Sequence, residues 1–243
     1  MSGNEYTEHI GKGLRLIVSE RYTFGTDALL LASFSAPKPK DAACDFGTGC
    51  GVIPFYWLGG GLPHTFAVEL QEGACEQLRR SIALNGIEDR FTLLQGDLRD
   101  LNGRLPHNHF DLITMNPPYT PAGKGVPSRE ESDRIARHES TLTPQELFSA
   151  AAKHLKFGGR MCVCQRPDRL TEIFCAMREA GIEPKRLRFV AQREGRSPWL
   201  FLLEGKRGRN PGLTVEPELH MEAPDGSCSP ELQAIYGDYA GER

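Results

Sequence analysis

Long apolar runs are absent from this sequence of 243 residues, and none approaches the roughly 20 residues that a membrane-spanning helix needs. The first residues, MSGNEYTEHIGKGLR, lack the apolar core of a signal peptide, so we expect a cytoplasmic protein. No CxxC pair occurs either, and the seven cysteines, an odd number, indicate reduced thiols and no metal site. Five cysteines fall in predicted strands or helices, where we expect them to be buried: Cys44, Cys75, Cys162, Cys164 and Cys175.

A large excess of charge is also absent. The net charge of −3 argues against a protein that simply coats nucleic acid. The charges are unevenly distributed, because residues 181–210 carry eight basic and three acidic side chains, whereas residues 211–243 carry one basic and seven acidic. The basic segment is able to meet phosphate groups, but a solvated charged hairpin explains it equally well, and the sequence leaves both interpretations open.

Short apolar segments alternate with amphipathic ones along most of the chain, which is typical of a parallel sheet with crossover helices. Two further strands follow at the end and are joined by a short loop, so we expect them to form an antiparallel pair. The pattern predicts an α/β fold in one domain over residues 1–243: a three-layer sandwich whose mostly parallel, seven-stranded sheet has one antiparallel strand. The predicted strands are 43–46, 65–70, 91–95, 111–115, 160–165, 187–191 and 199–204, and the main helices begin near 51, 71, 143 and 168.

A glycine-rich turn follows the first predicted strand. Glycines let the backbone pass close to a ligand, and Glu69 ends the next strand at a distance suited to ribose hydroxyls. The spacing is GxGxG rather than the GxGxxG of dinucleotide folds, so a pyrophosphate is the weaker interpretation, and a nearby carboxylate suits a cofactor with a positive charge. The candidate cofactor residues here are Asp45, Gly47, Thr48, Gly49, Gly51, Glu69 and Leu70.

A third acid follows the third predicted strand. Asp97, with Leu98 beside it, is placed to accept a hydrogen bond from an adenine amine. Polar groups at the ends of consecutive parallel strands meet at one edge of a sheet, so these residues and the glycine turn form one constellation.

The segment FDLITMNPPY, residues 110–119, is an apolar strand that ends in two prolines, which cannot continue it. The oxygen atoms of the Asn116 side chain and the Pro117 main chain can accept hydrogen bonds from an exocyclic amine and direct its lone pair at an electrophile. Tyr119 can stack on the plane of a base. A tight loop without catalytic meaning is the alternative for NPPY taken alone.

Together these motifs resemble those of the class I S-adenosylmethionine-dependent methyltransferases of the amino-methylating kind, which are marked by NPPY. The resemblance implies a Rossmann-like fold, with S-adenosylmethionine as cofactor and S-adenosylhomocysteine as product. It also implies that the glycine loop with Asp45 holds the methionine part, that Glu69 holds the ribose and that Asp97 contacts adenine. Catalysis falls to Asn116, Pro117, Pro118 and Tyr119, with Asn116 also at the cofactor.

Over nearly its whole length the chain is similar to the bacterial tRNA1(Val) adenine N6-methyltransferases, which modify the adenine beside the anticodon. The matching stretches include TFGTDALLLASF, NPPY, EPKRLRFV, EGKRGRNPGL and LQAIYGDY. This resemblance implies that the substrate is tRNA and indicates no obligate protein partner. The chain departs from the family at Cys228, where we expect an aromatic residue, and at RSPWL, which replaces a plainer loop.

Residues 1–40 and the segment after NPPY are expected to border the site. Thr26 and Asp27 cap a short helix on physical grounds, whereas the resemblance implies that they lie at the cofactor. Tyr22 and Phe24 are candidates for the base pocket. Residues 120–141 form a candidate lid loop, and residues 206–243 a C-terminal tail.

Other candidate substrate-binding residues are basic. In the lid loop, a solvated role and a tRNA-binding role are both open, and His138 is a weak candidate for a general base. The basic segment near 185–209 can hold the RNA stem electrostatically. These candidates are Arg134, Arg137, His138, Lys185, Arg186 and Arg196.

Three other functions are weighed against this one. A protein glutamine N5-methyltransferase acting on release factors shares NPPY, but only forty-four residues precede Asp45, too few for the helical N-terminal domain of those enzymes. Methylation of an adenine in another RNA or in DNA is also open. A relic fold that only binds RNA has no need to keep both motifs, and the glycine spacing disfavours an NAD-dependent oxidoreductase.

Overall fold

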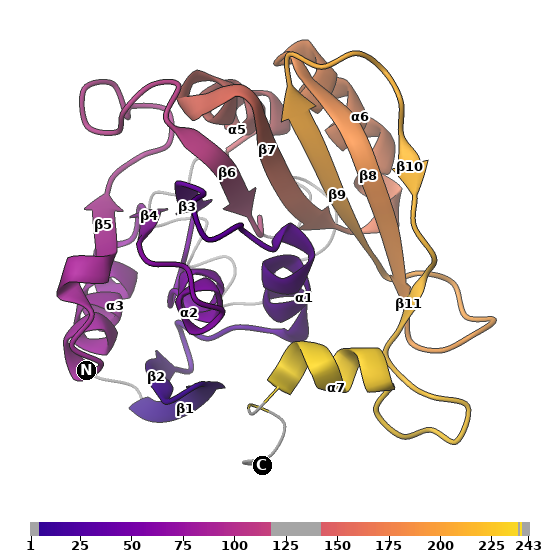
Figure 1. The fold of residues 1–243 in the computed structure, drawn as a ribbon, viewed down its shortest axis with the longest axis horizontal. Helices are drawn as coiled ribbons and strands as arrows, with labels where there is room; N and C mark the ends of the chain where they lie inside the picture. The colour runs from indigo at the N-terminus through magenta and orange to yellow at the C-terminus, as the bar shows by residue number, and fades with distance from the viewer. Residues whose placement is uncertain (1–4, 118–141, 238, 240–243) are drawn as a thin grey trace, which may run out of the picture.

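The computed structural model describes residues 5–117, 142–237 and 239 (Figure 1). Its main sheet has nine strands, of which seven form the central part in the order β8-β9-β7-β6-β3-β4-β5. Within the described residues, β9 is the strand that runs antiparallel to its neighbours. These strands are β3 (Ala43–Phe46), β4 (Thr65–Glu69), β5 (Phe91–Gln95), β6 (Phe110–Met115), β7 (Leu155–Gln165), β8 (Ile182–Ala191) and β9 (Leu200–Arg207). The predicted seven-stranded α/β sheet with one antiparallel strand is confirmed.

Helices cover both faces of this sheet and form the outer layers. Alternate residues of each strand point to opposite faces, so that Leu202 of β9 joins one apolar cluster and Leu203 joins the other. The first cluster includes residues of α1 (Thr26–Ser35), α2 (Val52–Gly59) and α3 (Glu72–Leu84). The second includes residues of α5 (Pro144–His154) and α6 (Leu170–Glu179). The 3-10 turns η1 (Glu88–Arg90) and η2 (Pro167–Arg169) precede β5 and α6.

A hairpin of β1 (Glu5–Gly11) and β2 (Leu14–Ser19) precedes α1 and was not predicted as strands. Leu16 and Val18 of β2 are fully buried. The Ile17 main-chain N–H donates to the Ser81 hydroxyl of α3 at 3.0 Å, which attaches the hairpin to that helix. The outer strand is mostly exposed and polar, so its sequence lacks the apolar signal by which strands are recognised.

The ends of several elements differ from the prediction. α5 begins as expected, with a capping box between Thr143 and Glu146. β7 and β8 each begin five residues earlier than predicted, at Leu155 and Ile182. The expectation that Thr26 or Asp27 caps α1 is wrong, because Gly25 occupies the cap position and no side chain caps the helix.

The C-terminal segment is more than a tail. Two short strands, β10 (Thr214–Val215) and β11 (Leu219–His220), run parallel to β8 along its outer edge. The chain then forms α7 (Pro230–Tyr236), drawn in yellow in Figure 1, which contacts α1. Its start is capped by the Ser229 hydroxyl, which accepts from the Leu232 N–H at 3.1 Å.

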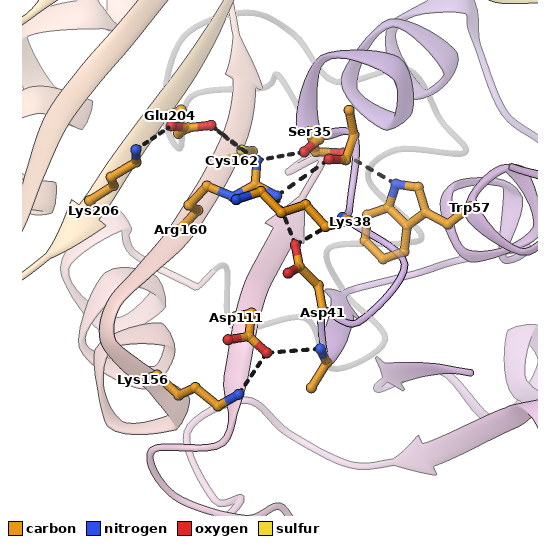
Figure 2. A network of polar contacts seen from close by, with 12 residues as sticks. Ser35, Lys38, Asp41, Trp57, Asp111, Lys156, Arg160, Cys162, Glu204 and Lys206 are labelled. Carbon is orange, nitrogen blue, oxygen red and sulfur yellow. Dashed lines mark hydrogen bonds and ion pairs between the residues drawn. The ribbon is translucent and has the colours of Figure 1, made fainter. Parts of the chain in front are cut away.

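A network of charged side chains fixes the C-terminal end of α1 to the amino-end edge of the sheet (Figure 2). The Arg160 guanidinium of β7 donates to the Ser35 main-chain oxygen at 2.8 Å and to the Asp41 carboxylate at 3.1 Å. Its other partners are Glu204 of β9, at 3.3 Å, and the Ala36 main-chain oxygen, at 3.4 Å. Because the last carbonyl groups of a helix lack partners within the helix, this arginine satisfies them and holds α1 across the sheet.

The cysteines and the apolar segments complete the comparison with the sequence. Cys44, Cys75, Cys162 and Cys164 are buried, as predicted, but Cys175 is exposed, so that prediction is wrong. All seven are free thiols. No helix in the described residues combines the length and the apolar character needed to cross a membrane, and no cluster of His, Cys, Asp and Glu there has a metal-binding arrangement.

Candidate active site

The glycine turn lies between β3 and α2 and is shaped by three residues with positive φ: Gly47 at 64°, Gly49 at 57° and Gly51 at 90°. The turn is close-packed at its end, since a Cβ atom on Gly51 would lie 2.5 Å from a methyl group of Leu78. Around Gly49, in contrast, a Cβ atom would meet no heavy atom within 4 Å. The backbone is therefore exposed to open space at the centre of the turn, where a ligand can approach it.

Glu69, at the end of β4, connects this turn to the start of α3. Its two carboxylate oxygens accept hydrogen bonds of 2.8 Å from the main-chain N–H groups of Gly49 and Gln71. The residue is only 6% exposed, whereas the neighbouring Leu70 is 43% exposed. A carboxylate and an apolar side chain thus stand together at the end of β4.

Asp45 is a buried carboxyl group on β3. It accepts a hydrogen bond of 2.6 Å from the Thr114 hydroxyl on the adjacent strand β6. Burial raises the pKa of Asp45 to about 7, although the hydrogen bond from Thr114 acts in the opposite direction. The group therefore changes its charge near neutral pH, directly behind the glycine turn.

Asp97 follows β5 and forms a local pair with Arg99, at distances of 2.5 to 3.1 Å. The hydrogen bonds from the Arg99 side chain hold the pKa of Asp97 below its ordinary value. Leu98 packs against the apolar cluster under α5 and α6. Asp97 is thus a partly exposed carboxylate at the same edge as Glu69, since β4 and β5 are parallel.

Asn116 directly follows β6, whose last residue, Met115, lies beside Phe46 of β3 in register. Its amide nitrogen donates to the Asp27 carboxylate at 2.7 Å, and its side-chain oxygen accepts from the Cys164 thiol at 3.1 Å. Three elements, α1, β6 and β7, therefore fix the orientation of one amide. The sequence did not predict either contact, because the partners are 89 and 48 residues away along the chain.

The other candidates from the first forty residues lie in two places. The Thr26 hydroxyl is 2.9 Å from the Tyr236 hydroxyl of α7, and the Phe24 ring lies 5.9 Å from that of Tyr239. Tyr22 lies elsewhere, against the first turn of α3, where a Cβ atom on Gly73 would be 2.7 Å from its hydroxyl oxygen. Tyr22 thus contacts the start of α3, and Phe24 contacts Tyr239 after α7, so their assignment to the base pocket stays a prediction.

The basic segment is divided between the two edges of the sheet. Lys185 and Arg186 are near the start of β8, at the edge opposite the glycine turn. Arg186 donates to the Phe34 main-chain oxygen at 2.5 Å and forms ion pairs with Glu204 and Glu216, both at 3.4 Å. The structure thus gives Arg186 internal partners away from the other candidate residues, and its assignment to the substrate stays a prediction.

The same holds for Lys185, whose ammonium group donates to the main-chain oxygens of Asn210 and Gly212 at 2.5 and 3.3 Å. Arg196, in contrast, lies in the loop between β8 and β9, at the edge that holds Asn116. Pro117 is described and half-buried. The remaining candidates lie outside the described residues: Pro118, Tyr119, Arg134, Arg137, His138 and the lid segment 120–141.

This fold, with its glycine turn and acids at successive strand ends, is that of a class I methyltransferase. The structure is similar to a predicted O-methyltransferase from Agrobacterium tumefaciens, with a TM-score of 0.71 and 22% identity over 88% of this chain and 96% of that one. It is also similar to geranyl diphosphate C-methyltransferase from Streptomyces coelicolor A3(2), solved with Mg2+, geranyl diphosphate and S-adenosyl-L-homocysteine. The TM-score there is 0.54, with 14% identity over 74% of this chain and 79% of that one.

The chain belongs to the methyltransferase small domain family, whose model matches residues 19–180. A sequence relative is the tRNA1(Val) (adenine(37)-N6)-methyltransferase of Tolumonas auensis, 26% identical over 217 residues, or 88% of each chain. The resemblance drawn from the motifs is confirmed: the chain is an S-adenosylmethionine-dependent methyltransferase.

The residues present fit this cofactor. The Thr48 hydroxyl is buried in the glycine turn and hydrogen-bonds to the Asp45 carboxyl group. The open space at Gly49 is beside it, and the nearby acids, Asp45, Glu69 and Asp97, suit a ligand with cationic groups and ribose hydroxyls.

Proposed function

We propose that the protein transfers a methyl group from S-adenosylmethionine to the N6 amine of an adenine in tRNA, specifically adenine 37 of tRNA1(Val). The observation that carries this proposal is the Asn116 side chain at the end of β6, oriented by Asp27 and Cys164 next to the glycine turn. The name of the relative from Tolumonas auensis supports the choice of tRNA.

The orientation of Asn116 suits an amine substrate. Because its amide nitrogen is engaged by Asp27, its oxygen points the other way, toward Cys164. A carbonyl oxygen has two lone pairs and can accept more than one hydrogen bond. The Asn116 oxygen, together with the Pro117 main-chain oxygen, accepts the two hydrogens of the adenine amine and leaves its nitrogen lone pair free to react.

S-adenosylmethionine, when bound, supplies a methyl group on a positively charged sulfur. The chain contributes alignment, which in such a transfer provides most of the acceleration. The glycine turn with Thr48 and Asp45 holds the methionine part, Glu69 the ribose, and Asp97 with Leu70 and Leu98 the adenine. Tyr119 stacks on the target base, and water accepts the proton that the methylated amine releases.

The rest of the chain has proposed roles as well. Residues 1–40 form a cap beside the site, with Asp27 directed at Asn116 and Thr26 at α7. Residues 120–141, with Arg134, Arg137 and His138, close over the target base. The whole chain acts as one cytoplasmic methyltransferase domain.

Methyl transfer from labelled S-adenosylmethionine to unmodified bulk tRNA tests the proposal, with release factor as the competing substrate. We expect N6-methyladenosine in the nucleoside digest of a single tRNA, in the position beside the anticodon. Label in a glutamine of the release factor, with none in tRNA, would leave the protein a methyltransferase but refute the tRNA substrate.

A further inference from the structure

A hollow of about 690 Å³ lies at the outer end of the carboxyl-end edge, between the β8–β9 loop and the start of the segment after β11. In Figure 1 this loop projects beyond the sheet beside α7. The residues that line the hollow are Gln192, Arg193, Arg196, Ser197, Trp199 and Glu222. Neither Trp199 nor Arg193 was a candidate site residue in the sequence analysis, and the loop contains the RSPWL stretch.

The two arginines of this loop differ from the other arginines of β8 and β9. Arg186 and Arg188 of β8 form ion pairs with glutamates, and Arg207 of β9 donates to Asn108 and to a main-chain oxygen. Arg193 and Arg196 are exposed, and neither forms an ion pair or a side-chain hydrogen bond with any described residue. Their guanidinium groups are therefore available to an external anion.

Trp199 stands beside them with 38% of its surface exposed. The loop fixes its position, because the Trp199 N–H donates to the Val190 main-chain oxygen at 3.0 Å and Pro198 restricts the preceding backbone. The acid in the lining, Glu222, already accepts from the Gln192 amide at 2.7 Å. An exposed aromatic ring next to two available guanidinium groups matches a base with its phosphates.

The distance from the reacting site also suits a neighbouring nucleotide. Strands in a sheet are about 4.8 Å apart, so β9 and β8 lie roughly 10 and 14 Å from β6, which carries Asn116. Trp199 and Gln192 lie three and four residues beyond the row of Asn116, which adds roughly 10 to 13 Å along the strands. A strand of RNA whose target base is at Asn116 extends over this distance within a few nucleotides.

We propose that the Arg193–Arg196–Trp199 hollow is a subsite for a nucleotide that flanks the target adenine: Trp199 stacks on its base, and the two arginines contact its phosphates. The inference rests on the proposed function, since it requires an RNA substrate. It assigns recognition of the RNA to the carboxyl-end edge and not to the basic residues at the start of β8.

The test compares charge removal at the two edges of the sheet. The double variant Arg193→Gln/Arg196→Gln removes the charges of the subsite, and Lys185→Gln/Arg209→Gln removes two charges at the opposite edge as a matched control. Binding of an unmodified anticodon stem-loop RNA is measured by fluorescence anisotropy over a range of salt concentrations. We expect the subsite variant to bind about tenfold more weakly and its salt dependence to fall by about 1.4 in the logarithmic slope, as for two lost phosphate contacts to a single strand.

A second pair of variants tests the ring itself. Trp199→Ala is expected to weaken RNA binding about tenfold, and Trp199→Phe, which retains a stacking surface, to weaken it much less. The kcat at saturating RNA and the affinity for S-adenosylmethionine should stay at wild-type values in all four variants, and melting temperatures confirm that each is folded.

The outcomes separate the subsite from the proposed function. Wild-type protein that methylates tRNA while the subsite variants bind RNA normally would overturn the subsite alone. Equal losses in the subsite variant and in the control at the opposite edge would also overturn it, because they would show diffuse attraction. A wild-type protein that neither binds nor methylates the RNA, or that uses these arginines for a release factor, would refute both.

Discussion

Two regions of the sheet both hold buried charged groups, but they hold them differently. In the network around Arg160, Glu204 is 5% exposed and has three cationic partners: Arg160, Arg186 and Lys206, at 3.3, 3.4 and 3.7 Å. Behind the glycine turn, Asp45 is 1% exposed and is held by the hydroxyl of Thr114. The first region is a closed network of opposite charges, whereas in the second Asp45 and Glu69 accept from neutral donors. This difference teaches that the first serves stability and the second is arranged for a cationic ligand.

The largest effect is expected at the carboxyl-end edge. Asn116→Ala should reduce kcat by about 100- to 1000-fold, because in the proposed function it removes the acceptor that orients the reacting amine. Affinity for S-adenosylmethionine, measured by calorimetry, and the melting temperature should change little. Loss of cofactor binding together with activity would contradict the role given to Asn116.

The amino-end edge should respond in stability instead. Arg160→Met is expected to lower the free energy of unfolding by about 3 kcal/mol, since it leaves a buried glutamate short of one partner and the end of α1 uncapped. Urea denaturation measures this change, and Arg178→Met, which breaks an exposed pair with Glu183, should cost less than about 1 kcal/mol. A strong fall in kcat for the folded Arg160 variant would contradict the conclusion that the network around Arg160 serves stability and not catalysis.

Asp27 tests how far the positioning of Asn116 matters. Asp27→Ala should lower kcat about tenfold or more, because the amide is then free to rotate and its oxygen is misplaced. Asp27→Asn retains an oxygen acceptor for the Asn116 amide and should recover most of the rate. Steady-state kinetics with tRNA in excess distinguishes this outcome from a change in KM, and equal losses in both variants would indicate that the charge matters and not the hydrogen bond.

The most gradual effect concerns pH. The pKa of Asp45 is raised from 3.8 to about 7, so between these values the folded protein keeps a proton that the unfolded chain has lost. This group's contribution to stability therefore declines as pH rises through that window, by at most about 1.4 kcal/mol per pH unit, and is constant above it. Asp45→Asn removes the slope. Chemical denaturation of both proteins between pH 5 and 8 should show that the free energy of unfolding of the variant increases relative to that of the wild type as pH rises. Parallel curves of stability against pH would show that Asp45 is ionised throughout.

The sequence predicted the elements whose signals are local. The apolar strands, the glycine turn and the prolines after Asn116 each mark a strand end, and in a parallel sheet the strand ends meet at one edge. It could not predict that Asp27 and Cys164 orient Asn116, because these contacts depend on how α1 lies across the sheet.

In the basic segment, residues that are close in the sequence lie far apart in the structure. Its eight basic side chains are close together in the sequence, but the hairpin of β8 and β9 runs across the sheet and back. Lys185 and Arg186 are therefore at one edge and Arg196 at the other. A count of charges along the chain contains no information on strand direction. Strand direction decides at which edge of the sheet each basic residue lies.

The length of α1 has a consequence of its own. Its last carbonyl groups are held by Arg160 and Arg186, and its second residue, Asp27, holds Asn116. Each residue of a helix adds about 1.5 Å and turns the chain by about 100°. One residue inserted between Asp27 and Ser35 would therefore turn the Asp27 carboxylate away from Asn116 while the other end stayed fixed. Insertions and deletions within α1 would thus break either the Asp27–Asn116 hydrogen bond at one end or the hydrogen bonds from Arg160 and Arg186 to main-chain oxygens at the other.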